Sequence, residues 1–200
     1  MRYELKWLIP TLDAGRVLQM VRLHPSFFRT EWPTRVVHSV YFDGPDYRAW
    51  RETELGISRR EKLRVRWYDD PLSARLERKL RRNTVGDKII EPLPALPLAD
   101  LVRHVRRMPP GRGQRPVLYT HYRRHYFRSR DHRLRLTVDS EMRAGLYGQR
   151  VSRRLDGVVI ELKFPTELAA AGRSAAAAIP ISRGRHSKYA RGMNALLGGS

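Results

Sequence analysis

Basic residues recur at every second position in segment 60–68, where Lys62, Arg64 and Arg66 share one face of an extended chain. Like charges that oppose one another on neighbouring strands destabilise a sheet by a few tenths to about 1 kcal/mol per pair. A solvated surface explains any single strand of this kind, but the pattern returns in several segments. A polyanion bound to these basic faces would remove the repulsion, so the spacing favours phosphate chemistry.

Acidic residues interrupt the same alternating patterns at four positions, namely Glu4, Glu77, Asp139 and Glu161. Mg²⁺ and Mn²⁺ prefer oxygen ligands and are usually held by one or two carboxylates together with phosphate oxygens of the substrate. Carboxylates among so many cations are therefore candidate ligands of a divalent ion. Glu77, which has arginines on both sides, is better explained as an ion-pair partner than as a metal ligand.

The composition limits the possible classes of protein. The 200 residues carry a net charge of +20 and no cysteine, which excludes disulfide scaffolds and cysteine zinc sites. The chain has no Walker-type glycine-rich loop, no apolar run of membrane-spanning length and no signal-peptide core, so we expect a cytoplasmic protein. An arginine-rich, lysine-poor composition is typical of a GC-rich genome, so codon bias is one explanation of the arginine content. The six lysines are then candidates for sites that need a compact ammonium: Lys6, Lys62, Lys79, Lys88, Lys163 and Lys188.

The elements that must position these residues are mostly strands. Period-two alternation predicts about eight of them, within 2–7, 36–43, 62–68, 75–81, 88–91, 117–128, 133–139 and 158–164. Helical spacing predicts helices over 11–23, 45–55, 98–108, 165–179 and 188–197. We expect one α+β domain over residues 1–200, with a large antiparallel sheet. If that sheet closes into a β-barrel with its basic faces inward and its helices outside, the interior becomes a positively charged channel.

Several short motifs together resemble the VTC domain, the polyphosphate polymerase branch of the triphosphate tunnel metalloenzymes, which is related to the CYTH proteins. The resemblance runs from Arg2 to about Leu197. Each motif is weak alone, but their number and order are specific. They are 39–43 (SVYFD), 60–68 (REKLRVRWY), 77–79 (ERK), 122–126 (YRRHY), 135–139 (RLTVD), 161–163 (ELK) and 187–189 (SKY).

The resemblance implies an eight-stranded antiparallel tunnel that uses Mn²⁺ or Mg²⁺ and moves the terminal phosphate of ATP onto a growing polyphosphate chain. ATP and polyphosphate are then the expected partners, and nucleic acid is not. Glu161 matches the metal carboxylate, and Glu4 is either a second ligand or an internal salt-bridge partner. The matching catalytic cations are Lys6, Arg64, Arg66, Lys79, Arg124, Arg135 and Lys188. The further phosphate-binding positions are Lys62, Lys88, Tyr122, Lys163 and Ser187.

One departure and two alternatives remain. Hydrolytic CYTH relatives begin with Glu-x-Glu-x-Lys, whereas this chain has Arg2-x-Glu4-x-Lys6, which fits the polymerase branch better. The first alternative is hydrolysis of tripolyphosphate or nucleoside triphosphate by the same tunnel. The second is a basic barrel that binds nucleic acid or polyphosphate without turnover. The aromatic residues Trp67 and Phe127 fall on the apolar faces, so core packing explains them better than base stacking does.

Overall fold

Nine strands form one antiparallel sheet in the computed structural model, which describes residues 2–10, 12–82, 85–184 and 186–198. Eight of them follow the path β1-β9-β7-β6-β2-β3-β4-β5, while the short β8 pairs with β7 alone. The bounds are β1 (Arg2–Ile9), β2 (Arg29–Asp43), β3 (Arg59–Tyr68), β4 (Asp70–Arg82), β5 (Val85–Pro92), β6 (Arg115–Arg128), β7 (Arg135–Leu146), β8 (Arg153–Arg154) and β9 (Val158–Pro165). The predicted set of about eight antiparallel strands is confirmed.

The five predicted helices are present; α5 has the predicted bounds, and the other four are somewhat shorter than expected. They are α1 (Ala14–Arg22), α2 (Arg48–Glu54), α3 (Leu98–Arg107), α4 (Ala169–Ala177) and α5 (Lys188–Leu197), with 3₁₀ turns at η1 (Pro109–Gly111) and η2 (Thr166–Leu168). The N-cap of α1 is Asp13, whose Oδ1 accepts from the Arg16 amide at 2.9 Å. Thr11, the first residue of the predicted helix, lies outside the described residues. No helix of the described ranges is long and apolar enough to cross a membrane.

The chain divides into two compact units, each of which contains strands of the sheet. Unit 1 comprises Met1–Arg35, Tyr122–Met142 and Asp156–His186. Unit 2 comprises Val36–His121, Arg143–Leu155 and Ser187–Ser200. The long strands β2, β6 and β7 contribute residues to both units.

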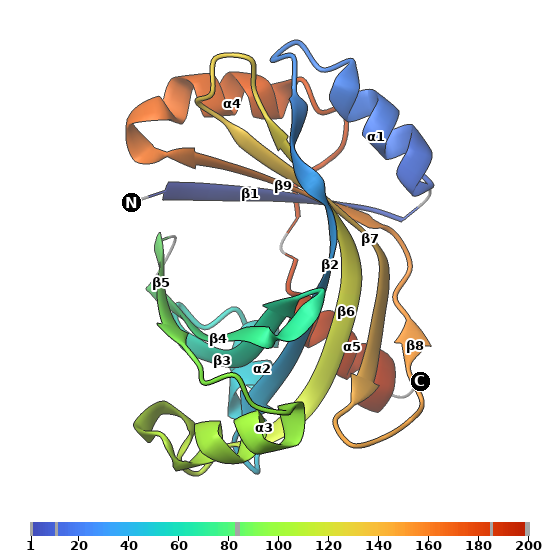
Figure 1. The fold of residues 1–200 in the computed structure, drawn as a ribbon. Helices are drawn as coiled ribbons and strands as arrows, with labels where there is room; N and C mark the ends of the chain where they lie inside the picture. The colour runs from blue at the N-terminus through green and yellow to red at the C-terminus, as the bar shows by residue number, and fades with distance from the viewer. Residues whose placement is uncertain (1, 11, 83–84, 185, 199–200) are drawn as a thin grey trace. The chain divides into compact units, whose positions relative to one another are not determined.

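In unit 1 the apolar face of the sheet is buried beneath two helices. Trp7, Leu136 and Ile160 come from three neighbouring strands and pack against Val17 of α1 and Ala175 of α4. Figure 1 shows α1 and α4 on the same side of β1 and β9. Because successive side chains of a strand point to opposite faces, this packing leaves Glu4, Lys6 and Glu161 of these strands on the other face.

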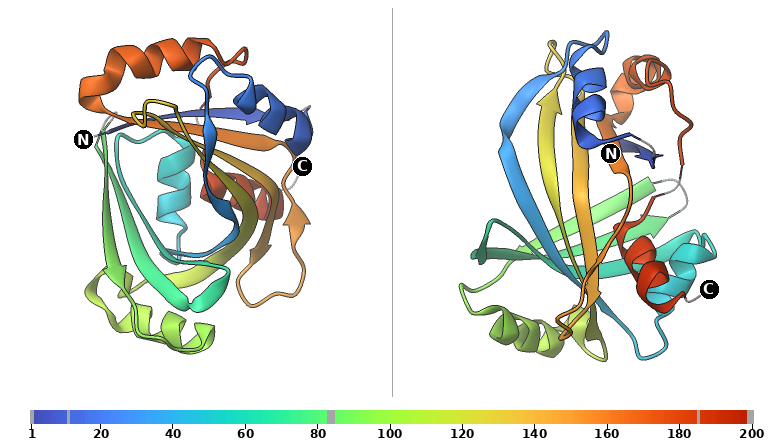
Figure 2. Two further views of the ribbon diagram at one scale, coloured as in Figure 1. Left: turned by 45° about the horizontal axis from the view of Figure 1, so that its top comes forward. Right: turned by 90° about the vertical axis from the view of Figure 1, so that its right-hand side faces the viewer.

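In unit 2 the apolar face of β3 and β4 packs on α3. Leu63, Val65 and Leu76 of the sheet meet Leu101 and Val105 of the helix. The helices α2 and α5 lie side by side, as the right-hand view of Figure 2 shows. Here too the helix covers one face, and Lys62, Arg64, Arg66 and Lys79 occupy the opposite one, whereas Arg78 pairs with Leu63 on the covered face. The predicted arrangement of helices on the apolar face and cations on the polar face is confirmed within each unit.

Candidate functional site

Two acidic and two basic residues alternate on the polar face of β1 and β9 in unit 1. The antiparallel register places Lys6 opposite Glu161, and Glu4 opposite Lys163. We call these four residues the carboxylate cluster. On the far side of β9, Thr137 pairs with Glu161. The cluster thus joins the first and the last strand of the chain, two segments that only the folded sheet brings together.

Both carboxylates of this cluster are held by both lysines. Lys6 Nζ lies 3.1 Å from Glu4 Oε1 and 3.3 Å from Glu161 Oε1. Lys163 Nζ lies 2.9 Å from Glu161 Oε2 and 3.9 Å from Glu4 Oε1. Only 5% of the Glu161 side chain is exposed, against 26% for Glu4. Glu4 thus makes a salt bridge to Lys6, one of the two roles that the sequence left open, and its role as a second metal ligand stays a prediction.

The donor set of the carboxylate cluster fits a hard divalent ion that completes its shell with substrate. Among the described residues no group of three or more histidine or acidic side chains could hold a metal by itself. Mg²⁺ and Mn²⁺ commonly use one or two carboxylates plus phosphate oxygens and water, which is what Glu161 and Glu4 can offer. Lys6 and Lys163 would then exchange their carboxylate partners for phosphate oxygens.

Arg124 of β6 is a buried cation whose direction is set by Asp139 of β7. Its Nε and Nη2 donate to the two carboxylate oxygens at 2.6 and 2.7 Å, and Nη2 lies 3.8 Å from Glu161 Oε2. Burial alone would lower the pKa of Arg124, but the charge and hydrogen bond of Asp139, together with the nearby Tyr122 and Glu161, outweigh burial and raise that pKa. The guanidinium also lies 5.2 Å above the ring of Tyr122, which is 1% exposed. Asp139 thus acts as the partner that orients Arg124, a role the sequence did not reveal.

Arg135 of β7 is more open to solvent, with 58% of its side chain exposed. It sits opposite Lys163 in the sheet, and its Nε is 4.0 Å from Glu31 Oε1. Glu31 also pairs with Arg128 of β6. The sequence analysis missed Glu31 because the predicted second strand began at residue 36, and segment 29–35 contains Pro33 and mostly polar residues.

Three of the six lysines form one row across unit 2. Lys62 of β3 pairs with Lys79 of β4, which in turn pairs with Lys88 of β5. We call these three residues the lysine row. Alternation predicted that Lys62 and Lys79 lie on polar faces, and the register shows that Lys88 is the direct neighbour of Lys79 on β5. Three lysines on one face of three neighbouring strands suit a chain of phosphates, because each phosphate unit brings its own negative charge.

Beside the lysine row, Glu77 is the centre of a cluster of cations. Its Oε2 accepts from Arg64 Nη2 at 2.6 Å and lies 3.6 Å from Arg66 Nη1, while Oε1 lies 2.5 Å from Lys88 Nζ. Burial alone would raise the pKa of Glu77, but the charges of Arg64, Arg66 and Lys88 hold that pKa far below its usual range. The predicted ion-pair role of Glu77 is confirmed. Arg66 is 4% exposed and also donates to Ser39 Oγ at 3.1 Å.

The start of α5 lies next to these residues in unit 2. Ser187 is the N-cap of the helix, and its Oγ accepts from the Ala190 amide at 3.3 Å and from Lys62 Nζ at 2.8 Å. Lys188 follows it and is 7% exposed. The positive charge of Lys188 is close enough to contribute, after Arg64 and Arg66, to a lowered pKa of Tyr41 against the effect of burial. Ser187 and Lys188 are thus brought to the basic face of β3.

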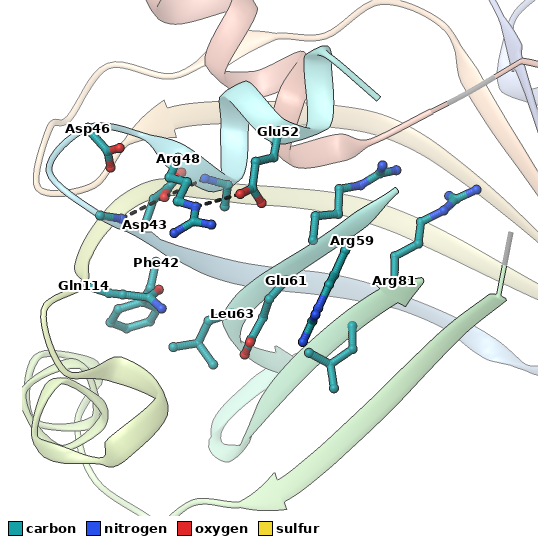
Figure 3. Close-up of a pocket in the computed structure, with 14 residues that line it drawn as sticks. Phe42, Asp43, Asp46, Arg48, Glu52, Arg59, Glu61, Leu63, Arg81 and Gln114 are labelled. Carbon is teal, nitrogen blue, oxygen red and sulfur yellow. Dashed lines mark hydrogen bonds and ion pairs between the residues drawn. The ribbon is translucent and has the colours of Figure 1, made fainter. Parts of the chain in front are cut away.

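A cavity of about 700 Å³ in unit 2 is separate from all of these residues. Figure 3 shows it between α2 and the apolar face of β3, with Phe42, Leu63, Arg59 and Glu61 in its wall. None of the site residues expected from the sequence lines it. The candidate site is thus the polar face of each unit, which carries the charges, rather than this cavity.

Comparison with known proteins identifies the family. The model of the VTC domain matches residues 1–95 and 95–197, and no curated protein matches the chain. Among solved structures, a candidate adenylate cyclase from Vibrio parahaemolyticus is 15% identical with a TM-score of 0.59, over 95% of this chain and 96% of that one. A candidate adenylyl cyclase from Hippeastrum, reported to have a dominant triphosphatase activity, is 16% identical with a TM-score of 0.57, over 98% and 97%.

These likenesses agree with the motifs and with the antiparallel sheet. At such low identities the solved structures show the fold alone, which this chain shares with the two candidate cyclases. This shared fold confirms the predicted fold class, an antiparallel sheet with helices on its outside. The family model matches almost all of the chain, on both units. The protein therefore belongs to the VTC domain family.

Proposed function

We propose that the protein is a metal-dependent polyphosphate polymerase, which transfers the terminal phosphate of ATP onto a growing chain of inorganic phosphate. The lysine row carries this proposal, because three ammonium groups in register offer successive contacts to successive phosphates. Arg64 and Arg66 extend the same basic face. Membership of the VTC family supports it. That the chain acts as one domain, and in the cytoplasm, stays a prediction.

In this reaction the protein must position the phosphates and neutralise their negative charge. The attacking oxygen belongs to a terminal phosphate and is already anionic, so no general base is needed. Arg64, Arg66 and Arg135 would bind non-bridging oxygens through charged N–H donors, and the lysine row would neutralise the chain. When bound by Glu161 and Glu4, the divalent ion supplies further charge neutralisation at phosphate oxygens.

Lys6, Lys163 and Lys188 would bind phosphates as compact ammonium groups, with Ser187 and Tyr122 as hydroxyl ligands. Lys6 and Lys163 already lie within salt-bridge distance of Glu161, so both ammonium groups are held next to the proposed metal ligand. Arg124 has two of its donors committed to Asp139 and keeps Nη1 for a phosphate. Its guanidinium is therefore oriented before substrate arrives, which lowers the entropy lost on binding.

Hydrolysis is the second candidate function. The solved structure from Hippeastrum, which has the same fold, is reported to have a dominant triphosphatase activity. The two reactions differ only in whether water or a phosphate oxygen attacks the terminal phosphate of ATP. Arg2, at a position where the hydrolytic relatives have glutamate, favours the polymerase, because one carboxylate of the metal site is replaced by a cation.

Incubation of the purified protein with ATP and Mn²⁺ or Mg²⁺ tests the proposal. We expect release of ADP together with acid-labile phosphate chains, which appear as a ladder on a polyacrylamide gel stained for polyphosphate. Omission of the divalent ion should abolish both products. Orthophosphate without a ladder would favour hydrolysis. Binding of polyphosphate without consumption of ATP would show that the protein is a binding module and not an enzyme.

Replacing the central residue of the lysine row, Lys79→Arg, is expected to slow turnover about a hundredfold. The charge is kept, but the planar guanidinium cannot occupy the place of a compact ammonium between Lys62 and Lys88. Loss of one charge-assisted contact to phosphate costs about 2 to 3 kcal/mol, which gives that factor. Steady-state release of ADP measures it.

The matched control is Arg112→Lys, which makes the reverse change at an exposed position just after η1. Its rate should equal that of the wild type. Equal rates for Lys79→Arg and Arg112→Lys would show that the lysine row has no special part in the reaction. An unchanged melting temperature alongside a large loss of rate would place the role of Lys79 in phosphate binding.

A further inference from the structure

We propose that Asp43 and Tyr189 are positioning residues, which fix the first turn of α5 and thereby hold Lys188 and Ser187 against the basic face of β3. The inference rests on the proposed function in one respect, namely that this face binds phosphate. Neither residue touches that face directly, and the sequence assigned a role to neither. Both belong to motifs that pointed to the family, 39–43 and 187–189.

Asp43 is a buried carboxylate at the end of β2, with four donors around it. It is 2% exposed, and Oδ1 accepts from the amides of Gly44 at 2.8 Å and Ala49 at 3.0 Å. Oδ2 accepts from the Trp50 amide at 3.0 Å and from Tyr189 Oη at 2.5 Å. Figure 3 shows Asp43 below the first turn of α2. Because buried charge is costly unless fully hydrogen-bonded, the position of each donor is strongly constrained.

Asp43 also replaces the missing cap of α2. The N-cap position of that helix is Tyr47, which has a left-handed backbone with φ of 54° and makes no side-chain cap hydrogen bond. Ala49 and Trp50, the second and third residues of the helix, have amides that would otherwise lack a partner within it. One carboxylate therefore ties β2, α2 and the Tyr189 hydroxyl of α5 together.

Tyr189 connects Asp43 to the basic face through its hydroxyl and its ring. It is 1% exposed, and burial together with the hydrogen bond to Asp43 raises the pKa of its hydroxyl, so that it remains a donor. Its ring stacks on Tyr41 with centroids 5.0 Å apart and an interplanar angle of 22°. Tyr41 Oη in turn accepts from Arg64 Nη1 at 3.1 Å. An unbroken set of contacts thus leads from Asp43 to an arginine of the proposed phosphate site.

The two residues that precede Tyr189 are the ones that this contact would position. Lys188 is its neighbour in the chain, and Ser187 both caps α5 and accepts from Lys62 of the lysine row. A rotation of the first turn of α5 would move both side chains. At the far end of the helix Asn194 holds α2 separately, since its Oδ1 accepts from Trp50 Nε1 at 2.7 Å and its Nδ2 donates to Glu54 at 2.9 Å. Loss of the Tyr189 hydroxyl should therefore loosen the first turn and leave the helix docked.

Chemical labelling of lysines tests the positioning without reference to any ligand. Tyr189→Phe removes one hydroxyl and keeps the aromatic stack. In this variant we expect Lys188 to react several-fold faster with an amine-specific acylating reagent, measured by mass spectrometry with Lys163 of unit 1 as the internal reference. Asn194→Ala, which removes the contacts at the other end of α5, is the matched control and should leave Lys188 labelling unchanged. Equal labelling in Tyr189→Phe and wild type would overturn the proposal.

A double-mutant cycle on tripolyphosphate binding tests whether Tyr189 acts through Lys188. Calorimetric titration should show about tenfold weaker binding for Tyr189→Phe, with Asp43→Asn affected in the same direction. In a Lys188→Ala background, Tyr189→Phe should add nothing further, whereas an equal loss in both backgrounds would contradict the positioning role. If the wild type did not bind tripolyphosphate at all, the proposed function would fail, and the labelling experiment alone would decide whether Asp43 and Tyr189 position Lys188.

Discussion

Glu161→Gln is expected to lower metal-dependent turnover of ATP about a hundredfold or more, while binding of tripolyphosphate is largely retained. The substitution keeps size and hydrogen bonding but removes the charge proposed to hold the divalent ion. A metal ion contributes several kcal/mol of charge stabilisation, and each 1.4 kcal/mol is a factor of about ten in rate. Binding is kept because Lys6 and Lys163 are released from Glu161 and become available to phosphate.

The rate of ADP release as a function of Mn²⁺ or Mg²⁺ concentration measures this effect, and calorimetric titration measures the binding. Glu167→Gln is the matched control, because Glu167 is an exposed residue of η2 in the same unit. It should behave as the wild type in both experiments. Unchanged metal-dependent turnover in Glu161→Gln would remove Glu161 from the mechanism.

Glu77→Gln is expected to destabilise the fold by about 3 kcal/mol at pH 7, because it leaves buried cations without their counter-charge. Glu77 contacts Arg64, Arg66 and Lys88, and its side chain is 2% exposed. The pKa of Glu77 is lowered in the folded protein, so its stabilisation is fully present above the unfolded value of about 4.3. It is lost as the pH falls toward the folded value, so the difference between variant and wild type should narrow below about pH 4.

Urea denaturation of both proteins, at pH 7 and at acid pH, measures the free energies of unfolding. Tripolyphosphate should stabilise the Glu77→Gln variant more than the wild type, because the ligand replaces the missing negative charge. The control is Glu61→Gln on the opposite face of β3, where the partially exposed pair with Arg78 contributes less than about 1 kcal/mol. Equal stability of Glu77→Gln and wild type would contradict the assigned charge balance of the cluster.

The sequence predicted which residues share a face, because strand alternation depends only on the chain itself. Lys62, Arg64 and Arg66 were expected together on one face, and their strand neighbours Leu63 and Val65 are buried on the other. It could not predict the lysine row, because the pairing of Lys62 with Lys79 and Lys88 depends on the register of two hairpins. The first of these hairpins contains a register shift between Arg66 and Tyr68, and a local irregularity of this kind changes which residues pair.

The partners that orient charged side chains were the features that the sequence analysis missed. Asp139 was expected among the metal-ligand candidates, but it orients Arg124 instead. The contact between Asp43 and Tyr189 joins residues 146 positions apart and leaves no periodic signal. Alternation reports on the faces of strands, whereas contacts of this kind arise only when the helices dock. The sequence thus predicted the charged residues of the candidate site. It did not predict the residues that orient them.

The fate of the terminal phosphate of ATP tests the central claim most directly. ³¹P NMR of a reaction that contains the protein, ATP and the divalent ion distinguishes the phosphates inside a chain from free orthophosphate. The account predicts that the γ-phosphate signal of ATP decays while signals of ADP and of internal chain phosphates grow together. Growth of orthophosphate in step with ADP, with no internal chain phosphate, would contradict it.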